Sequence, residues 1–343
     1  MKWKFYSLAF VAGMSILTAC SSDDNNDNDG NGGNGNGNEI ENGTILKGTI
    51  TSDVTLAAGN TYKLSGEYIV EEGATLHIEE GVKIIAVYDD IADYILVKQG
   101  GKINAVGTPD KPIVMTSEKE EPGAWGGIHI CGRAHTNAEG GKGSSEIGGA
   151  VYGGNNDADN SGTLQYIRLE YTGFAFDEEH EANGISFYGV GNGTIVDHCQ
   201  AYKGSDDGFE FFGGSVNVSN LVAVSCSDDS FDWTEGWNGK GTNLVAYQEA
   251  ESTLGYDCDC LMECDNNGSN NAATPVAHPV LKNLILVGNG GSKQGIRLRA
   301  GTEVEIDNAK VCGKGQPLTV ETALTENALK NGTSKPVSYT HLR

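Results

Sequence analysis

Apolar and acidic residues alternate in a short phrase that occurs twice in the middle of the chain. Residues 205–211 (SDDGFEF) return as residues 227–233 (SDDSFDW), at an offset of 22 positions. In each copy an acid stands between two aromatic residues, which is typical of a strand with one buried face and one solvated face. A repeat this short is one turn of a solenoid, because each turn buries its apolar side only against the next turn. The pattern predicts parallel strands, stacked coil on coil, with their acids aligned on the outside.

A column of asparagines follows the same repeat. One Asn precedes each of four apolar strands: Asn220, Asn243, Asn283 and Asn308. Stacked amides at a turn bond along a solenoid, so we expect a structural Asn ladder there, with His198 in the same column.

Glycine is abundant (49 of 343 residues), proline is scarce (7 residues) and helical periodicity is nearly absent. This composition favours an all-β chain.

Short strand-like segments separated by glycine fill the N-terminal half. They include residues 73–84 (GATLHIEEGVKI), 100–108 (GGKINAVGT), 112–116 (PIVMT) and 125–128 (WGGI). Their order resembles the first coils of right-handed parallel β-helix proteins, the pectin-lyase-like architecture. The resemblance covers most of residues 44–315. It implies one right-handed parallel β-helix, a single-stranded solenoid with about 22 residues per coil plus inserted loops.

The N-terminus has the features of an export signal. Lys2 and Lys4 precede an apolar stretch too short to span a bilayer, and residues 17–20 (LTAC) match a lipobox. This resembles a bacterial lipoprotein signal, which implies a signal peptide over residues 1–19 and lipid on Cys20. The alternative is an ordinary cleaved signal peptide.

A polar linker follows the lipobox. Residues 21–38 carry no apolar side chain, so we expect residues 20–40 to form a flexible tether. Its acidic start resembles the export signal of Bacteroidota surface lipoproteins. The resemblance implies an outer membrane lipoprotein that is exposed at the cell surface and held there by its lipid anchor.

The remaining chain divides into a domain and a tail. We assign residues 41–336 to the β-helix. Residues 337–343 (VSYTHLR) back-translate to a sequence that resembles the transposon end of sequencing-library adapters. We therefore expect an adapter-derived tail and a β-helix truncated at its C-terminus.

The formal net charge of −24 argues against binding of nucleic acid or anionic lipid headgroups, because both need a basic surface. We expect a monomer.

The repeated phrase belongs to a longer column of outward positions: Ser186, Glu210, Asp232, Glu263 and Arg297. Loops inserted before and after these strands predict a groove with the acids as its floor. Carboxylates on stacked strands, roughly 4.8 Å apart, repel one another unless a cation lies between them. We predict a calcium site made by Glu210, Asp232, Glu263 and Asp265. The alternative is a solvated acidic face that ends in an Arg297–Glu263 ion pair.

Two pairs of aspartates precede the outward acids. They resemble the paired aspartates of polygalacturonase-type β-helix glycosidases, which implies a catalytic role for Asp206, Asp207, Asp228 and Asp229. Arg297 and Arg299 lie roughly where those enzymes carry a basic substrate-binding motif. The Gly-His-Gly element of that family is absent here. A structural explanation is that Asp side chains bond to turn backbone.

Aromatic and cysteine residues in the expected wall loops suggest further roles. Trp237 and Tyr256 either stack on sugar or pack their loops down, whereas Trp233 should face inward. An exported chain meets oxidising conditions, so a disulfide from Cys258 is more plausible than a zinc site at this spacing.

These features predict a surface lipoprotein that binds extracellular polysaccharide in a calcium-assisted acidic groove. One alternative is a polysaccharide-degrading enzyme, either a polygalacturonase-like hydrolase or a lyase, that uses the paired aspartates. Another is a non-catalytic adhesive or structural surface protein. The sequence does not name the glycan.

Overall fold

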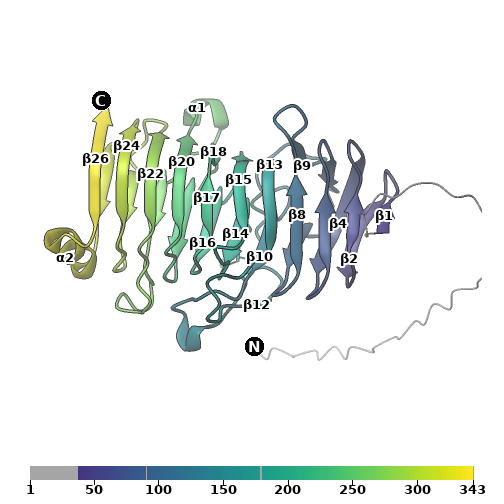
Figure 1. Cartoon of the computed structure of the whole chain (residues 1–343). Coiled ribbons are helices and arrows are strands. Elements are labelled where there is room, and N and C mark those ends of the chain that lie inside the picture. The colour runs from purple at the N-terminus through teal and green to yellow at the C-terminus, as the bar shows by residue number, and fades with distance from the viewer. Residues whose placement is uncertain (1–37, 90, 178–179, 343) are drawn as a thin grey trace, which may run out of the picture. The chain divides into compact units, whose positions relative to one another are not determined.

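Parallel strands wind through the described part of the chain as successive coils. The computed structural model describes residues 38–342, except residue 90 and residues 178–179, so the predicted signal peptide, Cys20 and most of the predicted linker lie outside it. The strands join a 24-stranded sheet, and a separate hairpin pairs β11 (Gly143–Ser144) with β12 (Val151–Tyr152) (Figure 1). The fold is a right-handed parallel β-helix, which confirms the predicted fold class.

Strand pairing divides the coils into three ladders, which we call face 1, face 2 and face 3. Face 1 is a ladder of β7 (Tyr94–Val97), β10 (Ile128–Cys131), β14 (Ile185–Tyr188), β16 (Phe209–Phe212), β19 (Phe231–Thr234), β21 (Met262–Cys264), β23 (Gln294–Leu298) and β25 (Gln316–Val320). It begins with the second halves of β2 (Ile45–Ile50) and β4 (Thr61–Val70).

Face 2 contains β1 (Asn38–Ile40), β3 (Val54–Leu56), β5 (Thr75–Ile78), β8 (Lys102–Val106) and β17 (Asn217–Ser219). Face 3 contains β6 (Lys83–Ala86), β9 (Ile113–Ser117) and β18 (Val222–Val224). Six longer strands run from face 2 into face 3: β13 (Gly162–Glu170), β15 (Ile195–Tyr202), β20 (Lys240–Tyr247), β22 (Val280–Val287), β24 (Glu305–Cys312) and β26 (Lys335–Leu342).

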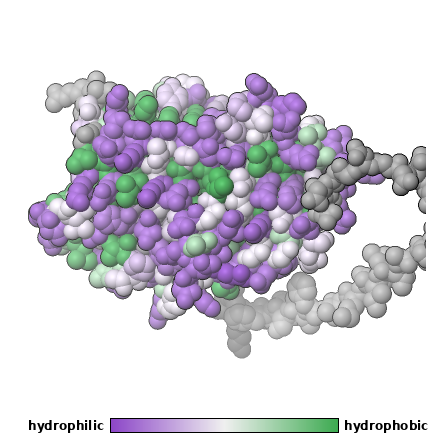
Figure 2. All heavy atoms as spheres, in the orientation of Figure 1, coloured by the Kyte–Doolittle hydropathy of each residue, from purple (hydrophilic) through white to green (hydrophobic). Residues whose placement is uncertain are grey.

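Helices are short and lie between strands. They are η1 (Glu139–Gly141), α1 (Glu251–Leu254) and α2 (Ala323–Asn331), the last of which lies beside β26 (Figure 1). Among the described residues, no helix has the length and apolar character needed to cross a membrane. Strands β1 and β26 extend past the domain limits of 41 and 336 expected from the sequence. The face seen in Figure 2 is mainly hydrophilic, with hydrophobic residues in small separate groups.

Aromatic stacking explains why the repeated phrase marks the centre of the fold. Phe209 pairs with Phe231 and Phe211 with Trp233, so the coil register equals the offset of the repeat. The rings of Phe209 and Phe231 lie 5.6 Å apart and nearly parallel inside the solenoid. Trp233 is fully buried, as predicted, and its indole N–H donates to the Thr302 hydroxyl at 3.0 Å.

The asparagine column is confirmed as a ladder at the bend between faces 2 and 3. The amides of Asn243, Asn283 and Asn308 each donate to the Asn of the preceding coil, at 2.9, 3.0 and 2.8 Å. All four Asn residues have φ between 54° and 61°, a left-handed conformation that Asn tolerates better than most residues. His198 adopts the same conformation (φ 52°) one coil before Asn220. The ladder is structural and lies on the surface.

Candidate functional site

The outward acids of face 1 form the column that the sequence predicts. Strand register places Ser186 opposite Glu210, Glu210 opposite Asp232, Asp232 opposite Glu263, and Glu263 opposite Arg297. Glu210, Asp232 and Glu263 are half-buried rather than fully solvated. The parallel stacking therefore holds like charges side by side in a partly dehydrated place.

Basic residues of one coil neutralise the last acids of this face. Arg297 Nη1 lies 2.8 Å from Glu263 Oε1, and Arg299 Nε lies 2.7 Å from Asp265 Oδ1. Arg299 also pairs with Glu263, and Lys293 pairs with Asp259. The Arg297–Glu263 pair of the alternative interpretation is present. Glu263 and Asp265, two of the four predicted metal ligands, are thus already paired with arginine, and both arginines predicted to bind substrate are engaged by carboxylates.

Six carboxylates on the two preceding coils have no such partner: Asp206, Asp207, Glu210, Asp228, Asp229 and Asp232. Within the described part of the chain, none of the six forms an ion pair with a Lys, Arg or His. Oxygens of Asp207, Glu210 and Asp232 lie within 4.8 Å of one another, as do those of Asp229, Asp232 and Glu263 and those of Asp206, Asp207 and Asp228. We call the six residues the unpaired acid cluster.

Burial and mutual repulsion raise the pKa values of the carboxyl groups in this cluster. Burial, followed by the charges of Asp228 and Glu181, raises the pKa of Asp206 to about 8. Burial is also the largest cause that raises the pKa of Glu210 and Asp232 well above the usual range, with neighbouring carboxylates next. Asp232 Oδ1 is buried and has no hydrogen-bond donor among the described residues. A cation is the group that would relieve both the repulsion and the missing partner.

The cluster geometry suits calcium. Calcium binds oxygen ligands at about 2.3–2.6 Å, so ligands on opposite sides of the ion are separated by about 5 Å or less. The separations within 4.8 Å satisfy this limit. Asp232 belongs to two of the three groups and would be shared between neighbouring positions. Asp207, Glu210 and Asp232 are the residues that could hold the ion without competition from arginine.

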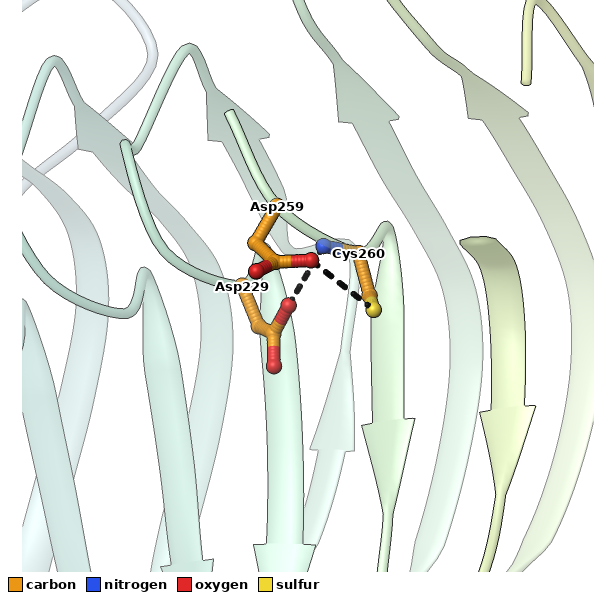
Figure 3. A group of neighbouring side chains, drawn as sticks. All are labelled: Asp229, Asp259 and Cys260. Atoms are coloured by element: carbon orange, nitrogen blue, oxygen red, sulfur yellow. Dashed lines mark hydrogen bonds between the residues drawn. The ribbon is translucent and has the colours of Figure 1, made fainter. Parts of the chain in front are cut away.

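Two of the four predicted catalytic aspartates hold the turns before the face 1 strands. Asn183 Oδ1 accepts the Asp207 backbone N–H at 3.1 Å, and Asp207 Oδ1 accepts that of Asp229 at 2.8 Å. Asp229 Oδ1 then accepts the Cys260 N–H at 2.6 Å (Figure 3). This ladder is the turn-stabilising role that Asp side chains commonly take. Asp206 and Asp228 are the members of the two pairs whose carboxylates take no part in this coil-to-coil ladder.

Loops add groups that sequence analysis missed. The segment between β11 and β12 brings Glu146 to face 1, where its Oε2 accepts the Tyr188 hydroxyl at 3.2 Å. Burial raises the pKa of Glu146 to about 7. The Asn183 amide donates to Glu210 Oε2 at 2.6 Å. No periodicity marks Glu146, because it lies in a glycine-rich excursion whose path is set by tertiary contacts.

The two candidate sugar-stacking residues do not present free rings. Trp237 is 1% exposed and stacks on Phe211 at 4.2 Å, so its prediction as a ligand contact is wrong. Its indole N–H donates to the Val216 carbonyl at 3.2 Å, which turns the loop inward. Tyr256 is half-buried and donates its hydroxyl to the Ser225 carbonyl at 2.8 Å. Its ring packs the wall loop down.

The seven described cysteines are free thiols, so the expected disulfide from Cys258 is not formed. Cys258 is buried, and its backbone carbonyl accepts a hydrogen bond from the Lys314 ammonium group at 3.0 Å. Cys260 Sγ lies 3.3 Å from Asp259 Oδ1 (Figure 3). These cysteines pack as small buried groups, as free cysteines usually do.

Comparison with curated proteins gives no match. Among solved structures, the chain is similar to the catalytic domain of a GH87 α-1,3-glucanase in complex with tetrasaccharides, at 11% identity and a TM-score of 0.30, over 83% of this chain and 63% of that chain. It is also similar to the Dettilon tailspike protein, at 9% identity and a TM-score of 0.27, over 79% of this chain and 62% of that chain. The chain thus spans less than two thirds of the length of either protein.

A family model of pectate-lyase-like β-helix domains matches residues 48–341. The match includes every strand of face 1 from β7 to β25 and the whole unpaired acid cluster. This chain belongs to the pectate-lyase-like β-helix family.

Proposed function

We propose that face 1 binds an extracellular polysaccharide with the help of a calcium ion held by the unpaired acid cluster. The observation that carries this proposal is the set of carboxylate oxygens within 4.8 Å of one another that lack any cationic partner among the described residues. Calcium takes six to eight oxygen ligands, and three carboxylates leave positions open for water or sugar oxygens. Vicinal hydroxyls or a uronate carboxylate of a glycan would complete the shell.

Retention on insoluble polysaccharides tests the proposal. The purified chain is incubated with neutral and uronate-containing polysaccharides, in chelator and in millimolar calcium, and the bound fraction and released reducing ends are measured. Calcium-dependent retention that Asp232→Asn abolishes is expected. Asp110→Asn is the charge-matched control, because Asp110 is exposed in the loop between β8 and β9. Absence of retention on every polysaccharide would favour the adhesive or structural alternative.

A hydrolase is the second candidate, and the state of Asp206 favours it. Oxygens of Asp206 and Asp228 lie within 4.8 Å of each other, and burial and the Asp228 charge raise the pKa of Asp206 to about 8, which favours a general-acid role for Asp206. A retaining glycosidase places its two carboxyl groups roughly 5–5.5 Å apart. Release of reducing ends by the wild type, lost in Asp206→Asn, would identify the enzyme. Retention without release would leave the binding function.

We further propose that the protein acts as a lipoprotein at the cell surface. The basis is the lipobox that ends at Cys20 and the acidic residues after it. Cys20→Ala is expected to release the chain from membranes, because an acidic tether has no membrane affinity of its own. Neutral replacements at residues 21–24 should keep the lipid but turn the protein toward the periplasm. Protease added to whole cells should cleave the wild type but not the variant with neutral residues at 21–24. Equal cleavage of these two proteins would disprove surface export.

A further inference from the structure

A polar pocket opens beside the unpaired acid cluster, where the face 1 strands end. It has a volume of about 710 Å³ and is lined by the end of β19 and by residues 137–139 and 267–270. Thr234, which lines it, lies two residues after Asp232 on the same side of β19. The pocket therefore begins roughly 7 Å along the strand from the acid column.

Two loops distant in the sequence hold each other to form the pocket walls. Asn137 is 8% exposed, and its amide donates to Asn266 Oδ1 at 2.8 Å and to the Pro275 carbonyl at 3.0 Å. Asn267 Nδ2 donates back to Asn137 Oδ1 at 2.9 Å. The Asn137 backbone N–H bonds to the Glu235 carbonyl at 2.9 Å. The walls are thus built before a ligand arrives, which lowers the ordering cost of binding.

The lining offers hydrogen bonds but no positive charge. Among the described residues, the Ser269 and Thr234 hydroxyls and the Asn270 amide nitrogen make no hydrogen bonds of their own and can turn toward a ligand. The charged groups of the lining are Glu139 and Glu235, both acidic. An anionic sugar would be repelled here, whereas hydroxyl groups can donate to the carboxylates and accept from the amide. None of the nine described lining residues is aromatic, so recognition is by hydrogen bonds.

We propose that this pocket is a subsite for neutral sugar units, separate from the cation-dependent acid cluster. The inference rests on the proposed glycan-binding function and names the class of sugar that this part of face 1 accepts. The volume falls in the usual range of ligand pockets, roughly 300–1,000 Å³. A glycan bound along face 1 would place a neutral unit in the pocket and a cation-binding unit over Asp232.

Calorimetric titration of the full chain tests the subsite. The probes are neutral tetrasaccharides of glucose, mannose, xylose or galactose and a tetragalacturonate, each in chelator and in millimolar calcium. At least one neutral tetrasaccharide is expected to bind in chelator. Ser269→Trp, which places a bulky ring in the pocket, should weaken that binding at least tenfold. Ala272→Trp on the same loop but outside the lining, and the surface variant Asp110→Asn, should leave it unchanged.

The possible failures separate the two proposals. Neutral binding that Ser269→Trp does not change overturns the subsite and leaves glycan binding in place. If tetragalacturonate is the only probe that binds, and it binds only with calcium, the subsite is likewise overturned and glycan binding stays in place. No binding of any probe overturns both. If the melting curve of Ser269→Trp shows misfolding, Asn270→Ala replaces it, with a several-fold loss expected and an unchanged affinity taken as refutation.

Discussion

Replacement of Asp232 by Asn removes the charge that lies between the two groups of acids on face 1. Asp232 has Glu210 on one neighbouring strand and Glu263 on the other, with ligand oxygens within 4.8 Å. Two ionised carboxylates at that separation repel by about 3.5 kcal/mol at an effective dielectric constant of 20. In chelator the wild type lowers this cost by keeping protons, so only part of the repulsion acts at neutral pH.

We therefore expect Asp232→Asn to raise the free energy of unfolding by about 1–3 kcal/mol in chelator at pH 7. For a folded domain of this size that corresponds to an increase in Tm of roughly 1.5–5 °C. In calcium the wild type should instead be more stable than Asp232→Asn. Wild type gains about 2.7 kcal/mol when free calcium is a hundred times Kd, whereas the variant loses most of this gain.

Thermal melts of wild type and Asp232→Asn, in chelator and in a calcium series, provide the measurement. Wild-type Tm should rise with the logarithm of the calcium concentration after saturation. Asp110→Asn should behave like the wild type in both conditions, because its carboxylate is exposed and outside the cluster. A wild type whose Tm ignores calcium, or a variant that gains as much as the wild type, would refute the cation site and leave a solvated acidic face.

Three other predictions follow from the same structure. In chelator, the free energy of unfolding of the wild type should fall from pH 5 to pH 8, because the pKa values of Asp206 (about 8) and Glu146 (about 7) are raised above their unfolded values. The expected slope is about 1.4 kcal/mol per pH unit for each extra proton that the folded state holds. Melting curves at a series of pH values measure this profile, and saturating calcium should flatten it. Asn243→Leu should lower the free energy of unfolding by about 1–3 kcal/mol, since it loses ladder bonds and puts Leu in a left-handed conformation, and Asn243→Gly should cost less because only the bonds are lost. Phe211→Ala should cost about 3–5 kcal/mol in denaturant titrations, because the ring is buried between two stacked aromatic neighbours; a cost under 1 kcal/mol would contradict the stacking.

The sequence predicted the parts of this protein that repeat at coil spacing. Alternating apolar and acidic residues determine which side chains face inward, so the register of Glu210, Asp232 and Glu263 followed from two copies of one phrase. The Asn ladder was predictable for the same reason. Stacking at a fixed offset turns sequence distance into spatial adjacency, and short-range patterns suffice.

Groups whose positions depend on long-range contacts could not be predicted from the coil repeat. Trp237 directly follows a glycine in an expected loop, yet the loop turns inward because the ring completes a stack with Phe211. Glu146 reaches face 1 through a hairpin without periodicity. The Asn137–Asn267 contact joins loops 130 residues apart, and no local signal marks either partner.

The distribution of charge over successive coils explains where a ligand site can form on face 1. Parallel stacking places each acid above an acid unless the next coil changes sign, and the coil of β23 makes that change with Lys293, Arg297 and Arg299. These three cations satisfy the acids of the coil before them. Among the described residues, the acids two and three coils back form no ion pair with these cations, because each coil adds roughly 4.8 Å. Arg299 acts on Asp228 and Asp232 only at longer range and lowers their pKa less than burial raises it. Repulsion is therefore concentrated on the coils of β16 and β19, and a bound cation would gain most there.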